Sequence, residues 1–348
     1  MAPPLPAHND PRPPSVRIGT LFAYPSAGDD KYENEDSMIS IKKILYPTDF
    51  SRCAGQAFAH AVHLARRHGA ELHISHVTVL HDDDPHNAAH HFPEVQDVLS
   101  HLEDLAHQDM AAVLREYHVR DLETKCINVR ASSAAPAILE YAEDNDIDLI
   151  VTGTHGRRGL KHLFLGSVAE EVVRLSNCPV LTLREREEPQ PVAAMTRILV
   201  PIDFSEHSRR ALVHAKWIAS WYNARLDLLH VIEEQLHPAF YGTGRTSIFE
   251  VMPDIRTKSK EKLGHLLEDT PGPNVMTESY VIGGRASGDI VEFAKANHSD
   301  LIVIATHGLT GIRSLLLGSV TEKVVRMAPC PVLTTKPFGK SLVSEQGA

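Results

Sequence analysis

The strongest constraint on the fold of this 348-residue chain is an internal duplication that covers most of its length. The matching blocks are residues 44–51 with 198–205, 72–77 with 226–231, 153–168 with 305–320, and 178–182 with 330–334. They occur in the same order in both halves, at an offset that stays between 152 and 154 residues. Repetition of this kind indicates two copies of one domain, so the fold of one copy predicts the fold of the other.

Within each copy, short apolar runs alternate with stretches of helical periodicity. In the first copy we expect strands at residues 44–46, 72–77, 125–129, 148–152 and 179–183, and helices at residues 54–68, 94–117, 136–144 and 167–175. Strands that are almost entirely apolar and are separated by helices are typical of a parallel sheet covered on both faces. The sequence therefore predicts an α/β protein with two open, parallel, five-stranded sheets. Such sheets bind ligands at the carboxyl ends of their strands.

Domain boundaries follow from the limits of the duplication. We place the first domain at residues 41–186 and the second at residues 195–338, with a linker at residues 187–194. Residues 1–40 are rich in proline and show no periodicity, so we expect a disordered N-terminal tail. Residues 339–348 form a second tail, which we expect to fray.

Charge and composition narrow the classes of partner and compartment. The formal net charge of −10 argues against a nucleic-acid partner. No run of about 18 apolar residues is present, which argues against a membrane span, and the N-terminus lacks the basic-then-apolar order of a signal peptide. The four cysteines (Cys53, Cys126, Cys178 and Cys330) show no Cys-x-x-Cys spacing. We therefore expect buried, reduced thiols and a cytoplasmic protein.

A glycine-rich segment after the fourth expected strand predicts phosphate binding. Gly153 and Gly156 flank a turn, nine residues follow, and Gly166 then precedes Ser167 and Val168 at a helix start. Glycines let the backbone approach a ligand closely. The first N–H groups of a helix lack intrahelical partners and bind anions well. This segment therefore marks the candidate ligand site of the first copy.

Helix capping offers a structural explanation for part of this segment. Ser167 with Glu170, and Ser319 with Glu322, have the spacing of capping boxes, each worth about 1 kcal/mol. Capping does not account for the three preceding glycines. Asp49 raises the same question at the first expected helix, although Ser51 can cap that helix alone.

The second copy departs from the first at one glycine, because Ala305 stands where the first copy has Gly153. If this position needs a positive φ, alanine is costly there, whereas at negative φ alanine merely adds a methyl group. The basic residues of the two loops are Arg157, Arg158 and Lys161 in the first copy and Arg313 in the second. Both differences favour the first copy as the phosphate site. They leave open whether the second copy binds a nucleotide.

The pattern Gly-x-x-Gly, nine residues, then Gly-Ser resembles the nucleotide-binding signature of the universal stress proteins. Pro-x-Asp at residues 47–49 and 201–203, His-Val at the end of the second strand, and Cys-Pro-Val-Leu near the end of each copy extend the resemblance over residues 41–336. The resemblance implies an adenine nucleotide alpha hydrolase-like, Rossmann-like sandwich. It also implies that ATP or another adenine nucleotide binds at the carboxyl edge of the sheet.

In that family the aspartate after the first strand lies by the adenine and ribose, and backbone near the strand-two valine reads the adenine edge. The residues so implied in the first copy are Pro47, Thr48, Asp49, Val77, Gly153, Thr154, His155, Gly156, Arg157, Gly166, Ser167 and Val168. Those in the second copy are Asp203, Val231, Thr306, His307, Gly308, Gly318, Ser319 and Val320.

The function that follows is an ATP-binding regulator of the stress response, with the two domains packed as an intrachain pseudo-dimer or two chains packed as a homodimer. The alternative is a nucleotide-free scaffold or interaction module. No P-loop, Ser-Gly-Gly or Gly-x-Ser-x-Gly motif is present, so we expect no catalytic residue and at most slow ATP hydrolysis. The His- and Asp-rich residues 81–91 have the composition of a metal site without clean ligand spacing, and a solvated loop is the alternative.

Overall fold

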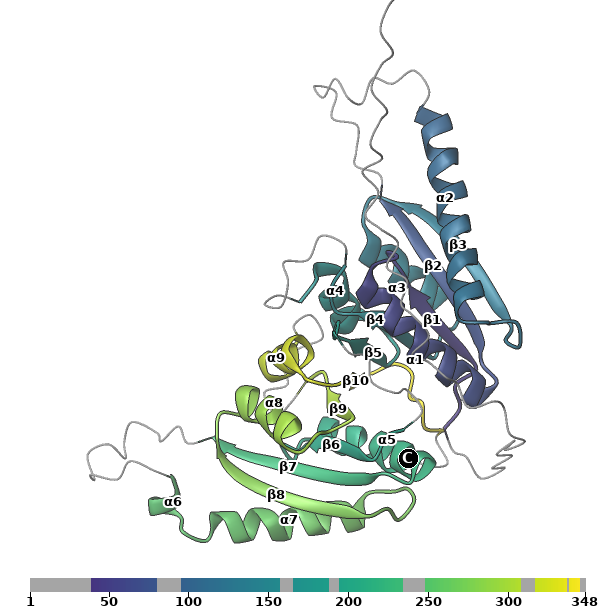
Figure 1. Ribbon diagram of the computed structural model, residues 1–348. Coiled ribbons are helices and arrows are strands. Elements are labelled where there is room, and N and C mark those ends of the chain that lie inside the picture. The colour runs from purple at the N-terminus through teal and green to yellow at the C-terminus, as the bar shows by residue number, and fades with distance from the viewer. Residues whose placement is uncertain are drawn as a thin grey trace, which may run out of the picture. The chain divides into compact units, whose positions relative to one another are not determined.

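The computed structural model in Figure 1 describes residues 39–79, 95–156, 165–187, 194–233, 248–307, 317–336 and 338–344. The strands of the first copy are β1 (Lys43–Pro47), β2 (Glu71–Val79), β3 (Thr124–Ala131), β4 (Leu149–Gly153) and β5 (Val180–Leu183). Its helices are α1 (Arg52–His68), α2 (Val95–Glu116), α3 (Ala134–Asp144) and α4 (Ser167–Leu175). Every element expected from the sequence of this copy is present, in the expected order.

The second copy repeats this order. Its strands are β6 (Arg197–Pro201), β7 (Arg225–Glu233), β8 (Thr277–Gly284), β9 (Leu301–Ala305) and β10 (Val332–Thr335). Its helices are α5 (Glu206–Tyr222), the single turn α6 (Ile248–Val251), α7 (Ile255–Asp269), α8 (Ala286–Ala296) and α9 (Ser319–Met327). The two copies therefore fold alike, as the duplication predicts.

The strands form one ten-stranded sheet in the order β3-β2-β1-β4-β5-β10-β9-β6-β7-β8. All pairs within a copy are parallel, and the two copies meet through the antiparallel pair β5–β10. Leu181 pairs with Leu333 at the centre of this seam. On either side, the Thr182 hydroxyl donates to the Val332 carbonyl and the Thr334 hydroxyl donates to the Val180 carbonyl. The seam thus has the exchange symmetry of a two-fold dimer interface within one chain.

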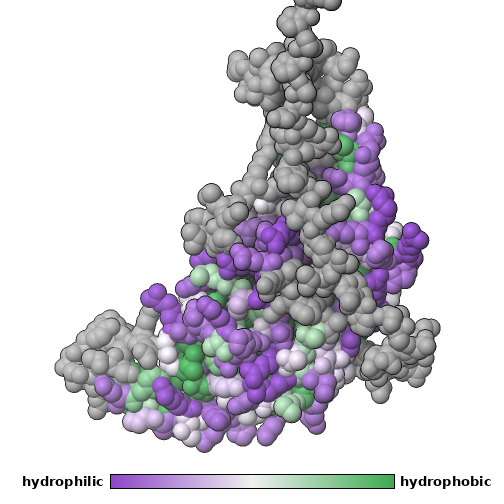
Figure 2. All heavy atoms as spheres, viewed as in Figure 1, coloured by the Kyte–Doolittle hydropathy of each residue, from purple (hydrophilic) through white to green (hydrophobic). Residues whose placement is uncertain are grey.

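The sheet is buried on both faces, which explains why its strands are almost entirely apolar. Alternate residues of β1 point to opposite faces: Ile44 and Tyr46 join one core cluster and Leu45 joins the other. The first cluster includes residues of α1, α2, α5 and α7, and the second includes residues of α3, α4, α8 and α9. On the face shown in Figure 2, hydrophilic residues cover most of the surface of these elements.

Two expectations from the sequence need correction. Cys53, Cys178 and Cys330 are buried free thiols, but Cys126 is exposed, because it lies on β3 at the edge of the sheet. The chain was expected to fray after Phe338, yet Leu342 and Val343 are each only 3% exposed. Their burial against the body of the protein explains the difference. None of the described helices combines the length and the apolar character that a membrane span requires.

Candidate functional site

The candidate site of the first copy lies where β1, β2 and β4 end. These strands are adjacent and parallel, in the order β2-β1-β4, so their carboxyl ends meet at one edge of the sheet. The chain continues from β1 into Thr48 and Asp49, and from β4 into Thr154 and His155. The topology therefore brings the Pro-x-Asp motif beside the glycine segment, although about 100 residues separate them in the chain.

The turn after β1 holds Asp49 through a strained backbone. Asp49 Oδ1 accepts a hydrogen bond from the Ser51 N–H at 3.0 Å, and the intervening Phe50 has a φ of 60°. A bulky residue in the left-handed region is costly and is often found at functional sites. Ser51, not Asp49, caps α1, since its hydroxyl accepts from the Ala54 N–H at 3.2 Å. Capping therefore does not explain Asp49.

The second copy contains the same turn. Asp203 Oδ1 accepts from the Ser205 N–H at 3.0 Å and from the Ser205 hydroxyl at 2.6 Å. Phe204 between them has a φ of 63°. The same left-handed backbone and the same aspartate at equivalent positions indicate that this turn is a shared feature of the two copies.

Gly156 lies in close contact with the side chain of Asp49. A Cβ at Gly156 would lie 2.4 Å from Asp49 Oδ2, well inside van der Waals contact. Neither Gly153 nor Gly156 has a positive φ. Close approach, not backbone handedness, therefore accounts for these two glycines. The carboxylate of Asp49 and the turn after β4 form one continuous surface.

Gly153 packs against the start of α1. A Cβ there would lie 2.8 Å from Cys53 Sγ and 3.2 Å from the Cys53 carbonyl carbon. In the second copy Ala305 is accommodated and is 7% exposed, and its carbonyl accepts from the Thr321 hydroxyl at 2.7 Å. Because φ is not positive at Gly153, the alanine in the second copy adds only a methyl group to an otherwise similar turn.

The start of α4 is drawn against the turn after β4. The Gly166 N–H donates to the Thr154 carbonyl at 2.8 Å, and a Cβ at Gly166 would lie 3.0 Å from that oxygen. The corresponding distances for Gly318 and Thr306 are 3.0 and 3.1 Å. The helix N-terminus, with the positive end of its dipole, therefore faces the strand ends in both copies.

The capping boxes expected at Ser167 and Ser319 do not form. Gly166 and Gly318 are the N-cap residues, with no side-chain cap hydrogen bond, because they already adopt the extended backbone of an N-cap. Ser167 and Ser319 are the first helical residues and are exposed. Their hydroxyls are thus on the surface at the helix start, where an anion would bind.

The remaining predicted site residues fall into three groups. Thr154 and Thr306 are buried, and their hydroxyls bond to Nδ1 of His155 and His307, which indicates structural roles for the threonine side chains. Pro47 and Thr48 are buried, Val77, Val231 and Val320 are partly buried, and Val168 is 38% exposed. Arg157, Gly308 and the His- and Asp-rich residues 81–91 lie outside the described residues.

His76 and His230 belong to this region; the sequence analysis noted the His-Val pair at the end of each second strand but counted only the valines as site residues. His76 Nδ1 donates to the Thr48 carbonyl at 2.8 Å, and its ring lies 4.8 Å from that of Phe50. His230 makes the same bond to the Ile202 carbonyl, and burial lowers its pKa. These histidines tie the end of the second strand to the aspartate turn. The histidine recurs before the valine in both copies, and this repeat is the sequence signal that would have assigned it to the site.

One side of the site differs in charge between the copies. Lys262 Nζ of α7 lies 4.2 Å from the centre of the Phe204 ring. The equivalent residue of α2, counted from the helix ends, is Asp109. A cation therefore adjoins the aspartate turn of the second copy, whereas the matching helix position of the first copy holds an anion. Among the described residues, no cluster of three His, Cys, Asp or Glu side chains could hold a metal ion.

Comparison with known proteins shows which family the chain belongs to. Residues 40–184 and residues 195–336 each match the universal stress protein family. The chain belongs to this family. Universal stress protein MJ0531 of Methanocaldococcus jannaschii is 32% identical over 141 residues, which are 40% of this chain and 81% of that protein. Universal stress protein Mb2028c of Mycobacterium bovis is 27% identical over 205 residues, 59% of this chain and 66% of that protein.

A solved structure extends the similarity of this universal stress protein over both copies. A universal stress protein from Archaeoglobus fulgidus covers 84% of this chain and 98% of its own, with a TM-score of 0.60 and 20% identity. At this identity the comparison supports the fold alone. It agrees with an α/β architecture of two tandem copies, as the sequence predicts.

Proposed function

We propose that this tandem universal stress protein binds an adenine nucleotide, with ATP as the leading candidate, at the carboxyl edge of the first copy. The observation that supports this proposal is the close contact between Gly156 and the Asp49 carboxylate, which a side chain at residue 156 would disturb. Neither helix capping nor a positive φ explains a glycine at this position. The N-terminus of α4 supplies unpartnered backbone donors beside it, as phosphate binding requires.

The chemistry of each group of residues suits it to one part of the nucleotide. The glycine turn at Gly153–Gly156 would let phosphates approach the backbone closely, and the start of α4 at Ser167–Val168 would hold them, because it offers N–H groups and a positive dipole end. Asp49 is an anion, so it suits ribose hydroxyls or an adenine amino group rather than phosphate. Pro47, Thr48 and the backbone near Val77 would border the base. The basic loop that includes Arg157 would add charge to the phosphate side.

The second copy is proposed as a second, modified site. Asp203, the backbone near Val231, Thr306–Gly308 and Gly318–Val320 occupy the equivalent sequence positions. Ala305 does not by itself close this site, because the position it occupies needs no positive φ. We propose a cytoplasmic regulator of the stress response in which the two copies act as an intrachain pseudo-dimer, with no catalytic residue assigned. A nucleotide-free scaffold is the competing function.

Calorimetric titration with ATP tests the proposal on the full chain. Gly156→Ala places a methyl group against Asp49 Oδ2 and should weaken binding at least tenfold. Gly55→Ala is the matched control, because a Cβ at Gly55 meets nothing within 4 Å. Mass spectrometry of ligands released from freshly purified, denatured protein gives an independent answer. A scaffold would release no nucleotide and would give no heat with ATP; equal affinity in both glycine variants would overturn the site assignment.

A further inference from the structure

The chain beyond the second copy forms a strap, residues 338–343, that reaches back to the first copy. A Cβ at Gly339 would lie 2.2 Å from the Asn177 carbonyl oxygen, and Gly339 has a φ of 86°, so glycine is required here. The next N–H, that of Lys340, donates to the same oxygen at 2.7 Å. The strap is therefore fitted to the loop that follows α4.

An ion-pair cluster anchors the strap to the turn between α3 and β4. Lys340 Nζ lies 2.7 Å from Asp146 Oδ1 and 2.9 Å from Asp148 Oδ1. Asp148 also accepts hydrogen bonds from the N–H groups of Lys42 and Lys43, at the start of β1. Lys340 thus joins the strap to the same carboxylate that positions the first strand of the protein.

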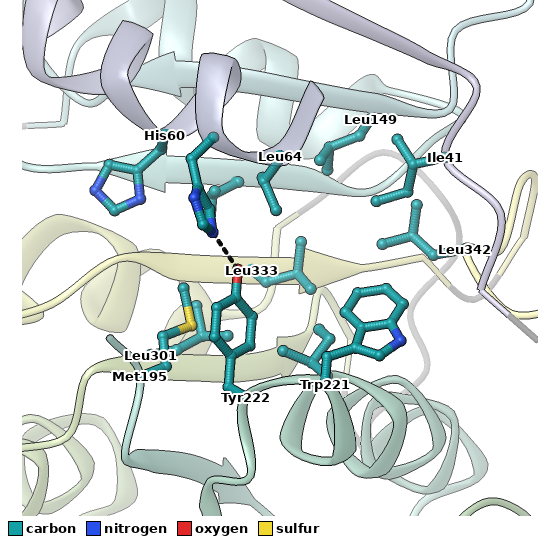
Figure 3. Close-up of a pocket in the computed structure, with 13 residues that line it drawn as sticks. Ile41, His60, Leu64, Leu149, Met195, Trp221, Tyr222, Leu301, Leu333 and Leu342 are labelled. Atoms are coloured by element: carbon teal, nitrogen blue, oxygen red, sulfur yellow. Dashed lines mark hydrogen bonds between the residues drawn. The ribbon is translucent and has the colours of Figure 1, made fainter. Parts of the chain in front are cut away.

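The strap then pairs with the segment that precedes β1. The Ser40 N–H donates to the Leu342 carbonyl at 2.9 Å, and Ile39 and Val343 form an antiparallel bridge. Leu342 lines an apolar pocket between the two copies, together with Ile41, Leu64 and Leu333 (Figure 3). The pocket has a volume of about 40 Å³, room for a few waters at most, and its apolar walls favour a dry cavity. Leu342 closes it.

His214 of α5 holds the strap from the second copy. Its Nδ1 lies 2.8 Å from the Arg210 carbonyl, which only accepts, so Nδ1 carries the proton and donates. Its Nε2 lies 3.2 Å from the Leu342 N–H, which only donates, and 3.2 Å from the Ser341 hydroxyl. The partners therefore require a neutral ring with a bare Nε2. A proton on Nε2 would point at the Leu342 N–H and break that contact, and the Ser341 hydroxyl would have to turn from donor to acceptor.

We propose that residues 338–343 are a latch joining the end of the second copy to the start of the first, and that protonation of His214 Nε2 releases it. Among the described residues, the charged groups around the ring offer this proton no carboxylate to pair with. Arg210 lies one turn earlier on α5, Lys340 is paired with Asp146 and Asp148, and α1 contributes only His60 and His63 to the pocket. Burial accordingly lowers the pKa of His214 below its ordinary value of 6.5.

The pH dependence follows from the sign of that shift. Above pH 6.5 His214 is neutral whether the strap is docked or released, so pH has no effect on the latch. As the pH falls below 6.5, the released state binds a proton that the docked state refuses, and the ratio of docked to released molecules falls up to tenfold per pH unit. The hydrogen bond from Lys340 lowers the pKa of Asp146, so this carboxylate stays ionised over pH 5.5–7.5 and its ion pair with Lys340 is not the sensor.

The duplication supplies a matched control. His60 of α1 is the equivalent of His214, at the offset of 154 residues that separates α1 from α5, and it is also buried. Neither strap residue that bonds to His214 bonds to His60. Replacing His60 by glutamine therefore removes a buried titrating ring of the same kind while leaving both hydrogen bonds between His214 and the strap in place, although His60 shares the pocket with Leu342.

Hydrogen exchange with mass spectrometry on the full chain between pH 7.5 and 5.5, corrected for intrinsic rates, tests the latch. In the wild type we expect protection of the 337–348 peptide to fall up to tenfold per pH unit below 6.5, and to remain lower than the protection of β1 and β6 peptides at every pH. His214→Gln keeps an acceptor that does not titrate and should abolish this slope, whereas His60→Gln should retain it. Lys340→Met should lower protection at every pH with the slope unchanged, which keeps the test valid if His214→Gln does not fold.

Three results would overturn the proposal. The first is a strap peptide whose protection does not change with pH in the wild type. The second is an unchanged slope in His214→Gln, or a slope lost in His60→Gln. The third is equal protection of the strap, β1 and β6 peptides at every pH, which would mean that the strap opens only by global unfolding.

Discussion

Replacing Gly153 by alanine places one methyl group in the tightest part of the first copy. The added Cβ would lie 2.8 Å from Cys53 Sγ, 3.2 Å from the Cys53 carbonyl carbon and 3.3 Å from the Ala54 nitrogen. Two of these three atoms are backbone at the first turn of α1, so they cannot yield by rotating a side chain. Overpacking of this kind costs about 1–3 kcal/mol. We expect Gly153→Ala to lower the free energy of unfolding by that amount.

Urea denaturation followed by circular dichroism measures the change, and a double-mutant cycle identifies its cause. Cys53→Ala removes the sulfur at 2.8 Å, so Gly153→Ala should cost about 1 kcal/mol less in that background. Gly55→Ala is the control for the substitution itself and should stabilise by about 0.5–1 kcal/mol, because a helical alanine there meets no neighbour. A loss below about 0.5 kcal/mol for Gly153→Ala, or strict additivity with Cys53→Ala, would refute the packing explanation.

Three further predictions concern the cap, the seam and acid stability. Ser51→Ala should cost about 1 kcal/mol because it removes an N-cap bond, whereas Ser167→Ala should cost less than about 0.5 kcal/mol because Gly166 is the cap; urea midpoints compare the two. Thr182→Val and Thr334→Val should each cost about 1 kcal/mol and be equal within error, since the two hydroxyls make equivalent bonds across the seam. Burial lowers the pKa of His60 to about 3 and of His63 and His68 to about 4, and also lowers that of His214. The free energy of unfolding should therefore be highest above pH 6.5. Below pH 6.5 it should fall by up to about 5 kcal/mol per pH unit, because all four histidines bind protons in the unfolded chain. Urea titrations from pH 7 to 5 would show this as proton uptake on unfolding.

Much of the fold could be read from the sequence because the signals are local and strong. Apolar runs such as Leu149–Val151 can only be buried strands, and the duplication allowed each assignment to be made twice. The seam could not be predicted, because Val180–Leu183 would satisfy its apolar pattern equally well at an edge, in a parallel pair or in an antiparallel pair. Which strand lies beside β5 depends on the packing of the whole second copy.

The candidate site was predictable in its location but not in its atomic causes. The glycine spacing identified the strand ends, yet it could not distinguish a glycine needed for handedness from one needed for proximity. In the structure neither Gly153 nor Gly156 has a positive φ, and each lies close to neighbouring atoms, of Cys53 and Asp49 respectively. Similarly, Ser-x-x-Glu fits a capping box by spacing, but Gly166 takes the cap position first. The left-handed Phe50 gives no sequence signal, because phenylalanine is disfavoured in that conformation.

The two copies have matching residues at the seam, where each copy must bond to the other. At the seam Leu181 matches Leu333 and Thr182 matches Thr334, because each residue of a pair bonds to the other copy. Beyond the seam, Arg184 donates to the Met327 carbonyl at the end of α9, and Lys336 donates to the Val173 carbonyl in the last turn of α4.

Each copy therefore caps the carboxyl end of the helix whose amino end adjoins the other copy's candidate site. A substitution at the seam must suit both copies, whereas a substitution at the aspartate turn affects one. Asp109 against Lys262, and Gly153 against Ala305, lie on the unconstrained side of this division. The seam therefore stays symmetric, whereas the two strand ends are free to differ in charge and in one glycine, and a substitution at one of them leaves the other unchanged.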